Sequence, residues 1–160
     1  MNTAEKESDD DRRISIICFS LTGKETAQKL KDGLEKCGYH TELYKKSRYL
    51  EDSIAESTAD WTAEHFHRED GLIFVGACGI AVRSIAPQVA SKKSDPAVLV
   101  VDECGQFVIS LLSGHLGGAN ELSLKAAQIL GAQPVVTTAT DLHKRFAVDV
   151  FSRKNDCEIL

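Results

Sequence analysis

The sequence predicts an α/β fold, with a largely parallel sheet flanked by helices and one antiparallel hairpin. Short apolar runs rich in β-branched residues alternate with segments of helical periodicity, which is typical of strand–helix–strand units. Two apolar runs are joined only by Asp102-Glu103-Cys104-Gly105, and a turn this short is expected to pair them antiparallel. With 160 residues, of which 42% are hydrophobic, the chain fits one domain with a buried core.

We expect the α/β domain to span residues 14–141. Residues 1–13 are polar and are expected to form a disordered tail, whereas residues 142–160 are expected to begin a following, truncated region. Gly38, Pro87 and Gly131 are expected to end helices. The apolar pattern predicts strands at 14–19, 40–44, 71–75, 97–101, 107–112 and 134–138, and helices at 25–37, 60–67, 80–86 and 118–130.

Composition excludes several classes of protein. The net charge is −5, and no cluster of lysine and arginine with interleaved aromatics is present, which argues against a nucleic-acid partner. No apolar run approaches the roughly 20 residues that span a bilayer, so no membrane partner is expected. The five cysteines form no CxxC pair, which favours a reducing cytoplasm over a disulfide framework. The sequence does not decide whether the protein forms a homodimer.

The most informative stretch is a glycine-rich turn around one histidine, between a predicted strand and a predicted helix. Glycines let the backbone approach a ligand closely, and the helix start presents N–H groups without intrahelical partners. A strand–turn–helix of this kind is a common ligand site in α/β proteins. The alternative is a structural turn with a capping histidine. The candidate residues are Gly114, His115, Gly117, Gly118, Asn120 and Glu121.

A second glycine turn, Gly76 to Gly79, follows the predicted strand at 71–75. Arg83 comes one helical turn later and is expected to face a cleft between the two glycine turns, where its planar fork would bind a carboxylate. The alternative for Arg83 is a structural salt bridge. If the predicted strands end at one edge of the sheet, the two turns, Thr137 and Thr138 would form one cleft rich in donors.

Other reactive residues are expected to be structural. His65 and His67 are two positions apart, so they make a poor metal pair and are expected on the solvated surface. Cys78 is expected to be a packing residue, because no histidine or acid lies at motif spacing from it. Ser20 and Lys24 lack the spacing of a phosphate loop. No protein-bound metal is predicted.

Several ordered blocks resemble the N-terminal part of the cobalt-precorrin-5A hydrolases of anaerobic cobalamin biosynthesis. The motif Ser113-Gly114-His115-Leu116-Gly117-Gly118-Ala119-Asn120-Glu121 is the most specific of them. The resemblance extends over roughly residues 72–151, whereas the stretch before Leu72 is similar only in its strand–helix–strand pattern. The similar blocks are residues 79–87, 92–98, 102–103, 110–121 and 134–141.

The resemblance implies hydrolysis of the δ-lactone of a cobalt-bound tetrapyrrole, with release of acetaldehyde. His115 is then the expected general base, oriented by Asp102 if the hairpin brings them together. Water is the expected nucleophile, with Ser113 as the alternative. The amides of Gly117 and Gly118 would stabilise the oxyanion.

The same resemblance implies the remaining site residues and ligands. Arg83, Lys92 and Lys93 would hold the carboxylate arms of the macrocycle. Cobalt would arrive inside the substrate, so no cofactor is expected. The alternative is a non-catalytic domain that presents tetrapyrrole to a missing C-terminal domain. The other expected substrate contacts are Gly79, Gly114, Asn120, Glu121, Thr137 and Thr138.

Overall fold

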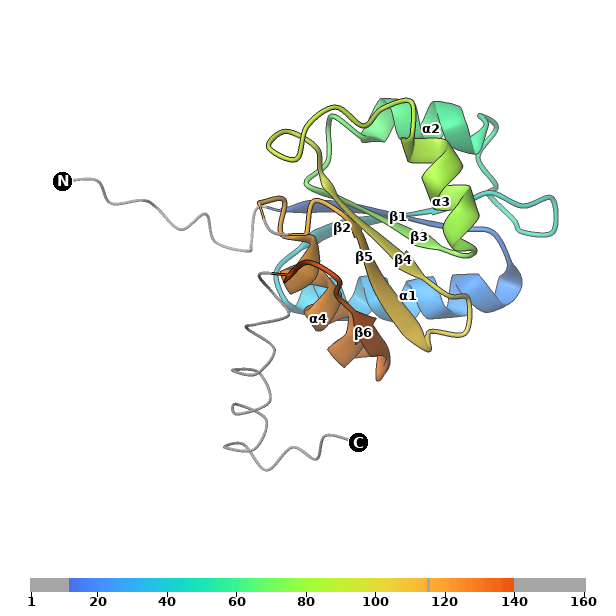
Figure 1. The fold of residues 1–160 in the computed structure, drawn as a ribbon. Helices are drawn as coiled ribbons and strands as arrows, with labels where there is room; N and C mark the ends of the chain where they lie inside the picture. Colours follow the sequence, from blue (N-terminus) through green and yellow to red (C-terminus); the bar gives the residue numbers. More distant parts are fainter. Residues whose placement is uncertain (1–11, 115, 140–160) are drawn as a thin grey trace.

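The computed structural model describes residues 12–114 and 116–139 (Figure 1). These residues form a six-stranded sheet in the order β2-β1-β3-β4-β5-β6. The strands are β1 (Arg13–Cys18), β2 (His40–Lys45), β3 (Gly71–Val75), β4 (Ala97–Val101), β5 (Phe107–Leu112) and β6 (Gln133–Val135). The helices are α1 (Leu21–Lys36), α2 (Thr58–His65), α3 (Cys78–Ile85) and α4 (Ala119–Leu130).

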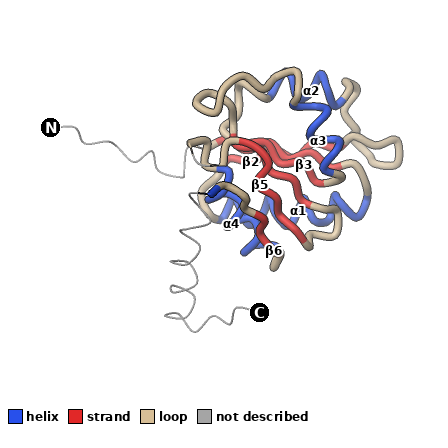
Figure 2. Tube along the Cα trace, in the orientation of Figure 1, coloured by secondary structure: helices blue, strands red, loops and turns tan. Residues whose placement is uncertain are grey.

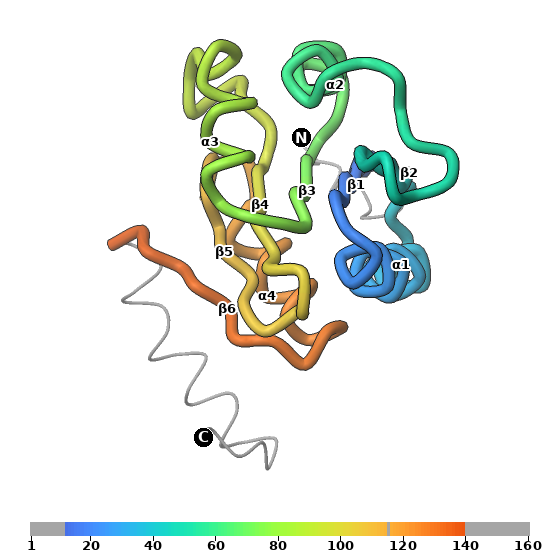
Figure 3. The backbone as a smooth tube through the Cα atoms, turned by 90° about the vertical axis from the view of Figure 1, so that its right-hand side faces the viewer, coloured from blue at the N-terminus to red at the C-terminus, as the bar shows by residue number. Residues whose placement is uncertain are grey.

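The helices form a layer on each face of the sheet. Helices α1 and α4 lie together on one face, and α2 and α3 lie on the other, with the strands between them (Figures 2 and 3). Every residue of the central strands β3 and β4 is buried, as expected for parallel strands covered on both sides. The predicted fold class is therefore confirmed.

Strand direction divides the loops between two ends of the sheet. Strands β1 to β4 run parallel, β5 runs antiparallel to β4, and β6 runs parallel to β5. Val101 at the end of β4 pairs with Val108 near the start of β5, whereas Val98 pairs with Leu112 at the end of β5. We call the end where β1 to β4 begin the amino end, and the opposite end the carboxyl end. Strand β5 finishes at the amino end.

Most element bounds agree with the sequence predictions, and the differences have local causes. Helix α1 begins at Leu21 rather than Glu25, because the hydroxyl of Ser20 caps it and accepts a hydrogen bond from Gly23 N at 2.9 Å. Strand β1 begins at Arg13, inside the expected tail. Strand β6 is shorter than predicted. Helix α4 ends at Gly131 as predicted, with φ 67°.

Two structural predictions were wrong. His65 is buried at 3% exposure, with its ring 4.7 Å from that of Trp61 and its Nδ1 3.3 Å from Glu69 Oε1, whereas His67 is exposed as expected. Helix α2 presents His65 on the same side as Trp61, four positions before it, so the pair enters the core together. Cys78 is exposed at the first position of α3 and is not a packing residue.

Some predictions fall on residues that the structure does not describe. These concern residues 1–11, His115 and residues 140–160, which include the expected truncated region. Within the described ranges, no helix combines the length and the apolar character that crossing a bilayer requires. In the same ranges, no three His, Cys, Asp or Glu side chains are grouped so that they could hold a metal ion.

Candidate functional site

The predicted site residues lie at opposite ends of the sheet. Gly79 and Arg83 follow β3, and Asp102 follows β4, so these three lie at the carboxyl end. The turn of residues 113–118 follows β5 and therefore lies at the amino end. The described residues thus do not form the single cleft that the sequence predicted, because the antiparallel direction of β5 carries its end to the other side.

The turn between β5 and α4, residues 113–118, is tightly wound in its described part, residues 113–114 and 116–118. Ser113 has φ 60° and Gly118 has φ 80°, both in the left-handed region. The N–H of Ala119 donates to Ser113 O at 3.1 Å, and the N–H of Asn120 donates to Gly114 O at 2.9 Å. These two amides at the start of α4 therefore serve the turn itself, which corrects the expectation that they point to a ligand.

Gly117 is required by close packing inside this turn. A Cβ at position 117 would lie 2.9 Å from Ser113 O and 3.3 Å from Asp95 O, and it would also overlap the Cβ of Ser113. Asp95 ends the loop before β4, where both of its carboxylate oxygens accept from Ala90 N at 3.1–3.2 Å. The turn therefore packs directly against the start of β4.

Asn120 holds the turn to its neighbours. The residue is 7% exposed, and its Oδ1 accepts from Ser110 Oγ at 2.7 Å while its Nδ2 donates to Thr138 Oγ1 at 2.9 Å. These bonds join β5, α4 and the segment after β6. The structure therefore gives Asn120 and Thr138 a supporting position, whereas Glu121 and Thr137 are exposed.

A pocket of about 250 Å³ opens beside the turn at the amino end. Gly117 and Gly118 form part of its wall, and Arg12 Nη1 lies 3.4 Å from the position that a Cβ on Gly118 would take. The exposed side chains of Lys92 and Lys93 stand on the neighbouring loop before β4. Arg12 is the cationic side chain among the residues that line this pocket, and Glu69, Asp70 and Asp95 line it as well.

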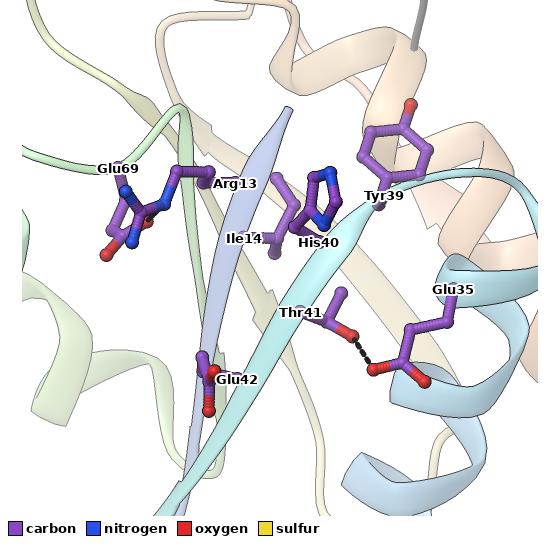
Figure 4. Close-up of a pocket in the computed structure, with 8 residues that line it drawn as sticks. All are labelled: Arg13, Ile14, Glu35, Tyr39, His40, Thr41, Glu42 and Glu69. Atoms are coloured by element: carbon purple, nitrogen blue, oxygen red, sulfur yellow. Dashed lines mark hydrogen bonds and ion pairs between the residues drawn. The ribbon is translucent and has the colours of Figure 1, made fainter. Parts of the chain in front are cut away.

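A second, larger pocket of about 510 Å³ lies next to it, along the starts of β1 and β2 (Figure 4). Three carboxylates line it, and its arginine, Arg13, pairs with Glu69 at 3.6 Å. Hydrogen bonds from Lys31 and Thr41 lower the pKa of Glu35, so this carboxyl stays ionised. The pocket beside the turn is also lined by three carboxylates, those of Glu69, Asp70 and Asp95, so acidic lining does not distinguish the two pockets.

The carboxyl end contradicts two predictions. Arg83 is exposed and folds back over Gly79, with Nη1 3.2 Å from the position of a Cβ there, so it does not face the turn of residues 113–118. Asp102 is used in the hairpin, where its Oδ1 accepts from Gln106 N at 2.8 Å and from Phe107 N at 2.6 Å. The hairpin places Asp102 at the opposite end of the sheet from Gly114 and Leu116, the neighbours of His115 in sequence.

The variant Asp102→Ala should therefore affect stability rather than chemistry. Losing the carboxylate leaves the amides of Gln106 and Phe107 without their acceptor, and we expect the free energy of unfolding to fall by about 2 kcal/mol. Denaturant unfolding measures this loss. A variant with unchanged stability but a kcat for the expected lactone hydrolysis reduced a hundredfold would instead support a catalytic role for Asp102.

Comparisons with known proteins agree with this fold. The model of the family Cobalamin synthesis G N-terminal matches residues 60–141. The cobalt-precorrin-5A hydrolase of Salmonella typhimurium is 42% identical over 152 residues, which is 95% of this chain and 41% of the relative. That of Priestia megaterium is 51% identical over 89 residues, which is 56% of this chain and 24% of the relative.

A solved structure is also similar. A crystal structure described as that of a cobalamin biosynthesis protein G homolog from Sulfolobus solfataricus aligns with a TM-score of 0.64 at 28% sequence identity. The alignment covers 79% of this chain and 37% of that one. The chain therefore spans less than half the length of the curated relatives and of the solved structure that it matches.

Proposed function

Because the chain belongs to the Cobalamin synthesis G N-terminal family, we propose that it carries part of the active site of a cobalt-precorrin-5A hydrolase. The reaction would open the δ-lactone of cobalt-precorrin-5A and release acetaldehyde, giving cobalt-precorrin-5B. Two relatives that bear the name of this enzyme are 42% and 51% identical to the chain.

The observation that carries the proposal is the turn of residues 113–118 beside its pocket. Lactone hydrolysis needs a nucleophile at the carbonyl carbon, a proton acceptor, and donors for the oxyanion. The turn joins a strained serine to two glycines whose backbone borders the pocket. His115, within the same turn in sequence, is the proposed general base.

The substrate would be held by its carboxylate arms. Lys92 and Lys93 are exposed on the loop beside the turn, and Arg12 lines the pocket. Amides of Gly117 and Gly118 are the proposed oxyanion donors, each worth ~3 kcal/mol in comparable sites. Cobalt enters as part of the substrate, so the proposal requires no cofactor held by the chain.

The test is incubation of the full natural protein with cobalt-precorrin-5A, with acetaldehyde and the opened lactone as readouts. We expect both products to form together, at a rate proportional to enzyme concentration. A matched incubation with heat-denatured protein gives the uncatalysed rate. Binding of the substrate without acetaldehyde above that rate would contradict the proposal and favour a domain that only presents tetrapyrrole.

A further inference from the structure

We propose that Ser113 is the nucleophile that attacks the lactone carbonyl, so that the reaction passes through an ester between the substrate and Ser113. This inference rests on the proposed function and names a catalytic residue within the same site. It replaces the expected direct attack by water. Three observations carry it: the backbone conformation of Ser113, its unpaired hydroxyl, and the packing of the turn around it.

The backbone of Ser113 is strained. Its φ of 60° lies in the left-handed region, and among the described residues only Asp52 is another non-glycine there. Left-handed conformation costs a residue with a Cβ roughly 1–2 kcal/mol. Glycine would avoid that cost, and the same turn already uses glycine at position 118 for φ 80°. A strained serine at a strand–turn–helix junction is how hydrolases hold a nucleophile in place.

The hydroxyl of Ser113 has no hydrogen-bond partner among the described residues. Its Oγ is buried, and in the described part of the chain only Trp61 Nε1 shares this condition among buried side-chain polar atoms. Other sheltered serine hydroxyls are satisfied: Ser84 Oγ donates to Ile80 O, and Ser123 Oγ donates to Asn120 O, each at 2.7 Å. An unpaired buried hydroxyl lowers the stability of the fold by about 1–3 kcal/mol. Folding alone therefore gives no reason for a serine at this position.

The turn presses closely on Ser113 and fixes its place. Gly117 leaves no room for a Cβ beside it, and Ser113 O accepts from Ala119 N at the start of α4. The residue is partly exposed although its Oγ is covered. Ser113 does not line the neighbouring pocket as the structure stands, so the proposal requires a change of its χ1 rotamer for the hydroxyl to reach a ligand there.

The proposed chemistry needs only water as a second reactant. Ser113 Oγ forms a bond to the lactone carbonyl carbon, and the ring C–O bond breaks. The proton of the hydroxyl ends on the departing alkoxide, which becomes a free hydroxyl on the two-carbon unit. That unit leaves as acetaldehyde when its C–C bond to the macrocycle breaks and its hydroxyl proton passes to the macrocycle carbon. Water then cleaves the ester, which gives the carboxylate and restores Ser113.

The test compares Ser113→Ala and Ser113→Gly with the wild type in the full natural protein. Alanine keeps the backbone strain and glycine relieves it, while both remove the hydroxyl. We expect both variants to lose acetaldehyde release by about three orders of magnitude or more. Ser84→Ala is the matched control, because it removes a sheltered hydroxyl on α3 and should keep the wild-type rate.

A second experiment looks for the ester directly. Acid quench of the wild type during turnover should show protein that is heavier by the mass of the bound substrate, and this heavier species should be absent in Ser113→Ala.

Each outcome decides a point. Turnover within tenfold of the wild type in Ser113→Ala or in Ser113→Gly would overturn the nucleophile. Loss of turnover without any adduct on the quenched wild type would also overturn it, leaving a hydroxyl that acts without a covalent bond. A wild type that releases no acetaldehyde would overturn the proposed function, and the nucleophile with it. Unfolding of Ser113→Ala is separated from loss of chemistry by Ser113→Gly, which should be at least as stable as the wild type.

Discussion

Replacing His115 by alanine is expected to lower the rate of lactone opening by about two to four orders of magnitude, the usual contribution of a general base. Histidine is the side chain whose unperturbed pKa lies closest to neutral pH, which suits it to the role of a general base. The expected result is a loss of kcat with substrate binding retained. Single-turnover kinetics with acetaldehyde as the readout measure the first, and a substrate titration measures the second.

His67→Ala is the matched control, because His67 is exposed in the segment after α2 and does not line the pocket beside the turn. This variant should keep the wild-type rate. Near-normal turnover by His115→Ala would remove His115 from the mechanism and leave the turn as a binding element. Loss of substrate binding, with turnover retained at saturation, would favour the same conclusion.

Gly117→Ala is expected to lower both stability and activity. The new methyl would lie 2.9 Å from Ser113 O and 3.3 Å from Asp95 O, and neither backbone atom can move without shifting β5 or the start of β4. Overpacking of this kind costs about 1–3 kcal/mol. We expect a lower denaturation midpoint and, because Ser113 is displaced, a loss of turnover larger than the loss of stability explains.

Gly131→Ala provides the comparison for this variant. Its added Cβ meets no atom within 4 Å, but φ 67° makes alanine strained there. That change should cost about 1 kcal/mol of stability and leave kcat unaltered. Equal effects of the two variants on kcat at matched fractions folded would contradict the role given to the turn.

The direction of β5 explains why the sequence predicted the fold correctly but predicted the arrangement of the site residues only in part. The short turn at Asp102–Gly105 predicted an antiparallel hairpin, and the structure confirms it. The same hairpin excludes a shared cleft between the glycine turns at Gly79 and Gly114, because one antiparallel strand ends at the opposite end of the sheet. The two sequence predictions were therefore incompatible, and strand direction decides between them.

Some of the remaining features depend on contacts that no sequence pattern reveals, whereas others had a signal in the sequence that was missed. The positive φ of Ser113, its unpaired hydroxyl and the close approach of Gly117 to Ser113 and Asp95 are seen only in the folded structure. The burial of His65 had a visible signal in its four-residue spacing from Trp61 within a predicted helix, and this signal was missed. The cap at Ser20 had a visible signal, since serine followed by a helical pattern is a common start, and it was missed by four residues.

The most direct test of the central claim is amide hydrogen exchange in the full natural protein, with and without cobalt-precorrin-5A. The His115→Ala variant keeps the substrate unreacted during the measurement. The account predicts slower exchange at Gly117, Gly118 and the loop of residues 91–95, all at the amino end of the sheet. Slower exchange confined to residues 76–83 and the start of α1, at the carboxyl end, would contradict it.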